Sequence, residues 1–169
     1  MQLTDSRDIM ANPAVVWAAI LNPEVLKECV PGCESMAGSV ADGFTAVVVA
    51  RVGPVKATFT GAVTLSDIDV GKAVKISGEG KGGVAGHAKG SAMVTMEPIE
   101  GGTRLHYDVD AAVGGKLAQL GSRIIEGFAK KMADEFFERF QSAFEAPDDD
   151  TEVVEGEVKK GWFKRLIGA

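Results

Sequence analysis

Hydrophobic positions in the last part of the chain follow the period of an α-helix. Between residues 114 and 144, large apolar side chains recur at spacings of three and four, at Leu117, Leu120, Ile124, Phe128, Met132, Phe136 and Phe140. This spacing places them on one stripe of a helix, with charged residues on the other side. The pattern predicts one long helix over 114–144, whose apolar face must pack against another part of the chain.

Upstream of residue 114, the dominant pattern is the period of two that is typical of β-strands. In the segment 44–52, Phe44 and Val48 fall on one face and Thr45 and Arg51 on the other. Glycine-containing turns separate such runs, as in a series of hairpins. The other predicted strands are 1–10, 59–65, 73–77, 87–97 and 103–112.

Two short helices are predicted after the first strand. Asn12 precedes Pro13, and Asn22 precedes Pro23, so each pair supplies an N-cap and a proline in the first helical turn. The Pro-Gly pair at 31–32 ends the second helix. No strand–helix–strand unit repeats along the chain. The order of elements therefore indicates an α+β fold, with a curved antiparallel sheet of about six to seven strands wrapped around the long C-terminal helix.

Length and charge predict one folded domain with a charged extension. The chain has 169 residues and a net charge of −6, and we expect residues 1–144 to form a single domain. Residues 145–158 contain seven Asp or Glu and no Lys or Arg, which predicts a flexible acidic linker. The domain itself is mildly acidic, which argues against nucleic acid as a partner.

The final segment, 159–169, combines cations with large apolar side chains and contains no acid. The residues concerned are Lys159, Lys160, Trp162, Phe163, Lys164, Arg165, Leu166 and Ile167. On a helix the apolar groups would share one face with the cations around it. This pattern favours an anionic membrane surface, and docking into a protein groove stays open as the alternative.

No group of residues has the spacing of a catalytic or metal-binding site. His87 and His106 are the only histidines, and His106 falls on the polar face of its strand. Cys29 and Cys33 lack further ligands at zinc-site spacing, which predicts a pair of thiols. The stretch 78–90 contains GxGxxG, but a strand follows it, which favours a hairpin over a dinucleotide site. The sequence favours a binding protein over an enzyme.

The expected compartment is the cytoplasm. The N-terminus lacks the basic and apolar regions of a secretory signal, and no apolar run is long enough to span a membrane. A disulfide between the two cysteines would be unusual in a domain of this size without an export signal.

Four blocks of the sequence closely resemble the CoxG family of carbon monoxide dehydrogenase subunits. In chain order they are NPAVVWAAILNPEVLKECVPGCESM, GPVKATFTGAVTLSDID, GEGKGGVAGHAKGSAMV and GGKLAQLGSRIIEGFAKKMADEFFERF. The resemblance covers about residues 1–144. It implies the START-like (SRPBCC) superfamily and its helix-grip fold, with an apolar cavity between the sheet and the long helix. It also implies an apolar aromatic residue at position 87, where this chain has His87.

The resemblance further implies a subunit without catalysis of its own. Its implied role is to attach a soluble molybdenum-containing carbon monoxide dehydrogenase, or a related oxidoreductase such as a hydrogenase, to the electron-transport chain. Our hypothesis is that the cavity carries an isoprenoid quinone (menaquinone or ubiquinone) or another lipid, and that the tail holds the domain at the inner face of the cell membrane. No metal or covalent cofactor is expected. A ligand-free tether and a START-like cyclase or hydrolase stay open as alternatives.

The predicted cavity residues come from the apolar faces of the sheet and of the helices. They are Trp17, Leu21, Leu26, Phe44, Val48, Phe59, Val63, Met93, Tyr107, Leu117, Leu120, Ile124, Phe128 and Met132. Among them, Trp17, Leu21 and Leu26 are expected nearer the mouth.

Overall fold

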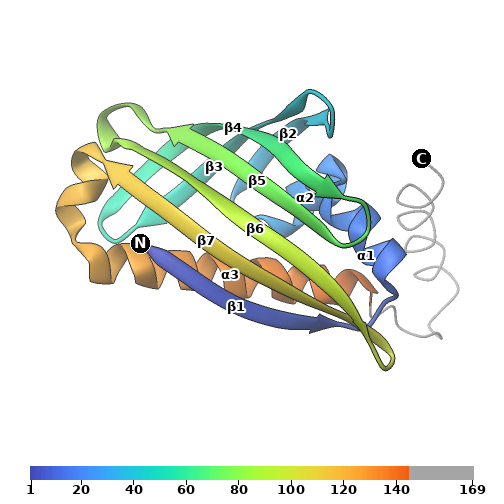
Figure 1. Ribbon diagram of the computed structural model, residues 1–169. Helices are drawn as coiled ribbons and strands as arrows, with labels where there is room; N and C mark the ends of the chain where they lie inside the picture. The colour runs from blue at the N-terminus through green and yellow to red at the C-terminus, as the bar shows by residue number, and fades with distance from the viewer. Residues whose placement is uncertain (145–169) are drawn as a thin grey trace, which may run out of the picture.

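Seven antiparallel strands form one curved sheet in the computed structural model, which describes residues 1–144 (Figure 1). The strands are β1 (Gln2–Ile9), β2 (Cys33–Ser39), β3 (Gly43–Val52), β4 (Val55–Asp69), β5 (Ala73–Lys81), β6 (His87–Ile99) and β7 (Gly102–Gly114). Their order across the sheet is β1-β7-β6-β5-β4-β3-β2, so the first strand joins the edge beside the last. The predicted linker, 145–158, and tail, 159–169, lie outside the described residues.

Two short helices follow β1, as the sequence predicts. They are α1 (Pro13–Ile20) and α2 (Pro23–Cys29). The side chain of Asn12 accepts a hydrogen bond from the backbone N–H of Val15, and Asn22 caps the first turn of α2 in the same way. Each asparagine thus satisfies a backbone donor that the first helical turn leaves without a partner.

The long helix, α3, begins later than predicted. It spans Ser122–Phe144, while Gly115–Leu120 form a separate 3-10 helix, η2. Between them, Gly121 has a φ of +92°, which interrupts the helix and which glycine adopts without steric cost. The predicted start at residue 114 is therefore wrong, because the hydrophobic spacing continues through a backbone break that only the glycine marks.

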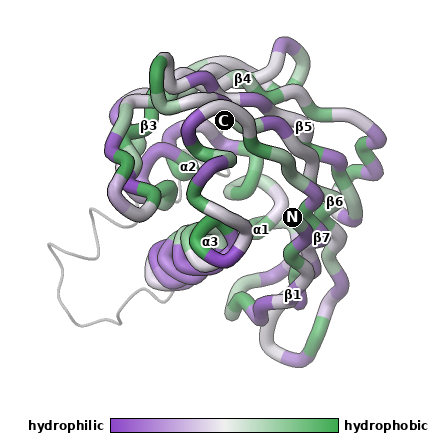
Figure 2. Tube along the Cα trace, turned by 90° about the vertical axis from the view of Figure 1, so that its left-hand side faces the viewer, coloured by the Kyte–Doolittle hydropathy of each residue, from purple (hydrophilic) through white to green (hydrophobic). Residues whose placement is uncertain are grey.

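The concave face of the sheet wraps around α3. Figure 1 shows α3 running along the sheet, and Figure 2, which views the molecule from one end of the helix, shows the strands curving around it. The helices α1 and α2 lie toward the end of the concave side where α3 ends (Figure 1). This arrangement confirms the predicted α+β helix-grip fold.

The glycine-rich stretch 78–90 forms the predicted hairpin. A single 3-10 turn, η1 (Gly83–Ala85), connects β5 to β6. Since a strand and not a helix follows, the stretch lacks the strand–loop–helix context that a dinucleotide fingerprint requires.

The tightly packed core lies toward one end of the fold, where α1 and the C-terminal half of α3 cover the sheet. Ile9, Val16, Leu105 and Phe140 each expose at most 1% of their surface. Within α3, the buried residues are Phe137 and Phe140, both in the C-terminal half. The N-terminal half of the helix is packed less completely, and this leaves space between helix and sheet.

Candidate functional site

A cavity of about 510 Å³ lies between α3 and the concave face of the sheet. We call it the main cavity. Its lining residues are Met1, Leu3, Ile20, Leu26, Val30, Pro31, Met36, Phe44, Val63, Ile76, Ala92, Val94, Leu105, Tyr107, Val109, Ala111, Phe128, Ala129, Met132, Ala133, Phe136 and Phe137. None of these residues has a charged side chain. Volume and lining are those of a site for a small apolar molecule.

Small side chains on both sides explain why the main cavity stays open. Ala92 and Ala111 line it from β6 and β7, and Ala129 and Ala133 line it from α3. Protein interiors are normally packed without voids larger than a water molecule. Four methyl groups in place of larger side chains leave volume that the neighbouring aromatic residues do not fill.

Phe128 and Met132 lie at the junction of three cavities. Both residues line the main cavity and also two smaller cavities of about 220 Å³ each. The first, which we call the end cavity, has an apolar lining that includes Val48, Phe59 and Leu117. Phe128 and Met132, which we call the junction residues, are the only described residues that line both the main and the end cavity.

The second small cavity, which we call the side cavity, has a partly charged lining. Arg51 from β3 and Lys131 and Glu135 from α3 surround it, together with Phe128 and Met132. The junction residues therefore lie between two apolar cavities and one that is partly charged.

Tyr107 lines the main cavity, and polar contacts with residues outside the lining hold its side chain in place. Nη2 of Arg7 donates hydrogen bonds to Oη of Tyr107 at 3.2 Å and to Oδ1 of Asp134 at 2.6 Å. The Tyr107 ring stacks on Phe137, with centroids 5.3 Å apart, and the Arg7 guanidinium lies 5.1 Å from the Phe137 centroid. Burial raises the pKa of Tyr107, and the hydrogen bond from Arg7 opposes the rise. The phenol is thus protonated at neutral pH and fixed in position.

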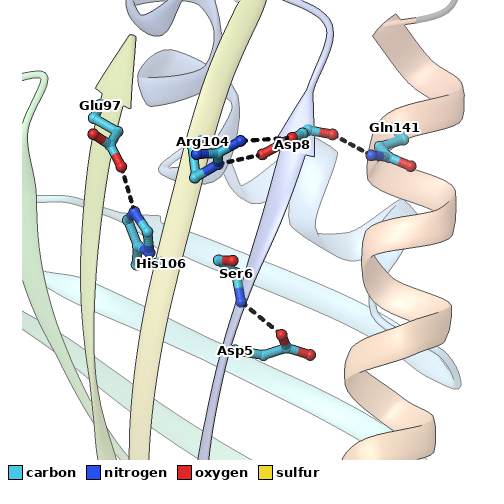
Figure 3. Close-up of polar contacts among 7 residues, drawn as sticks. All are labelled: Asp5, Ser6, Asp8, Glu97, Arg104, His106 and Gln141. Atoms are coloured by element: carbon cyan, nitrogen blue, oxygen red, sulfur yellow. Dashed lines mark hydrogen bonds and ion pairs between the residues drawn. The ribbon is translucent and has the colours of Figure 1, made fainter. Parts of the chain in front are cut away.

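Another set of polar contacts involves residues that do not line the main cavity (Figure 3). Nε of Arg104 donates to Oδ1 of Asp8 at 2.8 Å, and this hydrogen bond lowers the pKa of Asp8. Nε2 of His106 lies 2.8 Å from Oε2 of Glu97. Gln141 of α3 donates to the backbone carbonyl of Asp8, as Figure 3 shows. His106 is therefore partly exposed on the polar face of β7, as the sequence predicts.

Most of the predicted cavity residues line one of the three cavities. Those at the main cavity are Leu26, Phe44, Val63, Tyr107, Phe128 and Met132. Those at the end cavity are Val48, Phe59 and Leu117, together with the two junction residues. The predicted tail residues, 159–167, lie outside the described residues.

Two predicted cavity residues are exposed instead. Met93 exposes 39% of its surface, while its neighbours Ala92 and Val94 line the main cavity. Side chains alternate between the faces of a strand, so Met93 belongs to the outer face and its prediction is wrong. Ile124 exposes 40%, while the next residue of α3, Ile125, lines the end cavity in its place.

Three further predicted residues line none of the three cavities. Trp17 of α1 and Leu21, which follows that helix, pack against the hydrophobic core. They therefore do not form the cavity mouth that the sequence predicts. Leu120 is the last residue of η2 and lies before the break at Gly121. The row of apolar side chains on α3 therefore does not continue into η2.

The prediction missed several lining residues on the inner strands. Val109 and Ala111 share the strand phase of Tyr107 and line the main cavity, so alternation alone could have identified them. Met1 and Leu3 also line it. Their position depends on the pairing of β1 with β7, which sequence periodicity does not reveal.

Within residues 1–144, no three His, Cys, Asp or Glu side chains lie close enough together to hold a metal ion. No helix in the same part of the chain has the length and hydrophobicity needed to cross a membrane. Cys29 and Cys33 are free thiols.

The two thiols should differ in reactivity. Cys29 is buried, and burial raises the pKa of its thiol to about 11, while Cys33 is half-buried and its pKa is also raised by burial. Because the thiolate is the reactive form, we expect iodoacetamide at mildly alkaline pH to modify Cys33 well before Cys29. Timed labelling followed by peptide mass spectrometry measures both rates. Faster labelling of Cys29 would contradict its placement.

The raised pKa of Cys29 makes the stability of the folded state depend on pH. A folded-state pKa above the ordinary value of 9.0 means that the folded protein holds the Cys29 proton more tightly than the unfolded chain. The contribution of Cys29 to stability is therefore complete below pH 9.0 and is lost as the pH rises toward about 11.

Comparison with known proteins places this fold and cavity in a family. The CoxG family, described as a subunit of carbon monoxide dehydrogenase, matches residues 6–145. A conserved protein from Geobacillus kaustophilus is 27% identical, with a TM-score of 0.78 over 84% of this chain and 93% of that chain. No protein of curated function matches the chain.

More distant structures share the fold alone. A protein from Chromobacterium violaceum is 17% identical, with a TM-score of 0.63 over 87% of this chain and 99% of its own. Ara h 8.0201 is 14% identical, with a TM-score of 0.56 over 82% of this chain and 94% of its own. The family match covers nearly all of the folded domain and agrees with the helix-grip architecture. The chain therefore belongs to the CoxG family of carbon monoxide dehydrogenase subunits.

Proposed function

We propose that this chain is a non-catalytic subunit that binds an isoprenoid quinone, or a lipid of similar shape, in the main cavity. The observation that carries the proposal is the lining, which is almost entirely apolar and includes no charged side chain among the described residues. A polar metabolite would lose its hydrogen bonds to water there without finding partners, whereas a hydrocarbon chain would gain by burial. The open volume favours a carrier over a ligand-free tether.

The lining also bears on which part of a ligand the main cavity would take. Arg7, which holds the Tyr107 hydroxyl, and Asp134 do not line the cavity. We therefore expect the hydrocarbon part of the ligand, and not its polar head, to fill this space. Within residues 1–144, no acid–base pair lines the main cavity, and this supports binding over a cyclase or hydrolase activity.

We further propose that the chain connects a molybdenum-containing carbon monoxide dehydrogenase, or a related oxidoreductase such as a hydrogenase, to the quinone pool at the inner face of the cell membrane. The description of the matching family supports the enzyme partner. In this scheme the enzyme performs the chemistry, and the chain carries quinone between the bilayer and an enzyme that does not itself reach lipid. The charged tail, 159–169, would contribute to holding the protein at the membrane.

Affinity for quinones should increase with tail length. Each buried methylene contributes about 0.8 kcal/mol, or roughly fourfold in affinity, until the cavity is filled. We would titrate delipidated protein by calorimetry with quinones that share one head group and differ in alkyl tail. An affinity independent of tail length would contradict the proposal.

A further inference from the structure

One end of the fold is strongly basic. The turn between β3 and β4, the turn between β5 and β6, and η2 with the start of α3 all lie at the same end (Figure 1). Segments 51–56, 79–89 and 115–126 carry six cations and two acids: Arg51, Lys56, Lys81, Lys89, Lys116 and Arg123 against Glu79 and Glu126. All six cations are exposed, and none has an ion pair within residues 1–144. We call this surface the basic end.

The opposite end has the reverse charge. Successive turns of an antiparallel meander alternate between ends, so the β2–β3, β4–β5 and β6–β7 turns lie together (Figure 1). Segments 39–43, 66–72 and 97–101 carry five acids and one cation: Asp42, Asp67, Asp69, Glu97 and Glu100 against Lys72. The molecule is therefore polarised along the direction of its strands.

The elements of the basic end touch one another and form a continuous surface. A methyl group on Gly53, in the β3–β4 turn, would lie 3.2 Å from Cγ2 of Ile124 on α3. One on Gly115 of η2 would lie 2.8 Å from Cα of Gly86, next to η1. Figure 2 views the molecule from this end.

Exposed apolar side chains accompany the cations at the basic end. Val84, in η1, exposes 91% of its surface, and Ile124 exposes 40%. The acidic end also exposes apolar groups, including Val70 at 76%, but beside Asp67 and Asp69. Exposed apolar side chains therefore do not distinguish the two ends by themselves. The basic end differs because its exposed valine occurs together with cations, whereas that of the acidic end occurs together with acids.

The end cavity lies beneath the basic end. Its lining includes Val52 and Gly80, beside the two turns, and Leu117 of η2. It meets the main cavity at Phe128 and Met132. A surface in contact with this end would thus lie next to a short apolar route into the main cavity.

We propose that the basic end docks directly on an anionic lipid bilayer, with Val84 inserted among the lipid head groups and the end cavity facing the membrane. Cations attract the protein to an anionic surface, and exposed apolar side chains anchor it there. This proposal deepens the proposed function and rests on it for its purpose, which is exchange of ligand through the end cavity. The docking contact belongs to the folded domain and is separate from the predicted tail.

The test uses the full chain and a matched pair of probes. In a Cys33→Ala background, Val84→Cys and Val70→Cys each carry an environment-sensitive fluorophore at opposite ends of the molecule. Vesicles contain equal parts of phosphatidylcholine and phosphatidylglycerol, with pure phosphatidylcholine for comparison. We expect the fluorophore at position 84 to brighten and shift to the blue on anionic vesicles only, and the fluorophore at position 70 to stay as in buffer. Equal responses at both positions, or none at position 84, would overturn the proposal.

Charge substitutions provide a second measurement. Lys81→Gln with Lys116→Gln should lower partitioning onto anionic vesicles about 25-fold, since each cation at such a surface contributes roughly fivefold. Lys27→Gln with Lys72→Gln removes the same charge away from the basic end and should have little effect. Equal losses in the two double variants would overturn the proposal and indicate that net charge alone governs binding.

Ligand content of the same samples separates this proposal from the proposed function. If ligand is retained but the fluorophore at position 84 does not respond, docking through the basic end is wrong while the carrier function stands. If the fluorophore inserts but no ligand is recovered, the docking proposal stands and the carrier function fails.

Discussion

Phe128→Glu is expected to abolish retention of the cavity ligand while the protein still folds. Phe128 is half-buried and lines all three cavities, so the substitution places a carboxyl group at the point where they meet. Burying a carboxyl group against a hydrocarbon ligand without a hydrogen-bond partner costs at least about 2 kcal/mol, which lowers affinity by more than roughly tenfold. Organic extraction and mass spectrometry of the purified variant measure the retained ligand.

The control for this prediction is Val70→Glu, in the turn between β4 and β5. Val70 is 76% exposed, lines none of the three cavities and lies away from the basic end, so the same new charge faces water there. This variant should keep the ligand content of the parent protein. Equal retention in both variants would contradict the assignment of Phe128 to the cavity wall.

Phe140→Ala is expected to cause the largest loss of stability, about 3–5 kcal/mol in the free energy of unfolding. Phe140 is fully buried, and its ring centroid lies 5.6 Å from that of Phe136 and 5.0 Å from that of Phe144. Removing the ring leaves a void in the one region where α3 packs tightly against the core, and it also removes these aromatic contacts. Urea unfolding measures the change.

Phe128→Ala is the matched control for the stability prediction. The ring of Phe128 already borders open volume, so less buried contact is lost and the change should be at most about half as large. A similar loss in both variants would show that the two halves of α3 are packed equally well. That result would contradict the division of the fold into a packed core and an open cavity.

Much of the fold follows from the sequence because its local patterns agree with one another. Asn12-Pro13 and Asn22-Pro23 mark helix starts that the structure confirms, since an asparagine cap and a proline act within a few residues. The strand alternation likewise predicts which face of each strand is apolar. The family resemblance adds the helix-grip fold and the expectation of a cavity.

The errors arise where long-range packing decides the outcome. The periodicity of residues 117, 120 and 124 resembles helix, yet Gly121 turns the backbone and removes the first part of the predicted stripe. Trp17 is large and apolar, but α1 uses it to pack against the core. Met1 and Leu3 line the cavity only because β1 pairs with β7. Among these outcomes, only the break at Gly121 has a local marker, which is the glycine itself.

A helix-grip fold with a partly filled interior separates stability from binding. The aromatic cluster in the C-terminal half of α3 and the core beside α1 hold the helix to the sheet, while Arg7 joins β1 to Asp134 of α3. The alanines of the cavity wall leave packing incomplete only around the main cavity, where a bound ligand would fill the space. We therefore expect bound ligand to raise the melting temperature, because it contributes the contacts that those positions lack.

The most direct test of the central claim is mass spectrometry of an organic extract of the full-length protein, purified from cells that make an isoprenoid quinone. We expect one quinone in near-stoichiometric amount, and its loss from Phe128→Glu but not from Val70→Glu. An extract that contains no quinone or other lipid, or equal lipid in both variants, would contradict the claim that the apolar cavity carries the ligand.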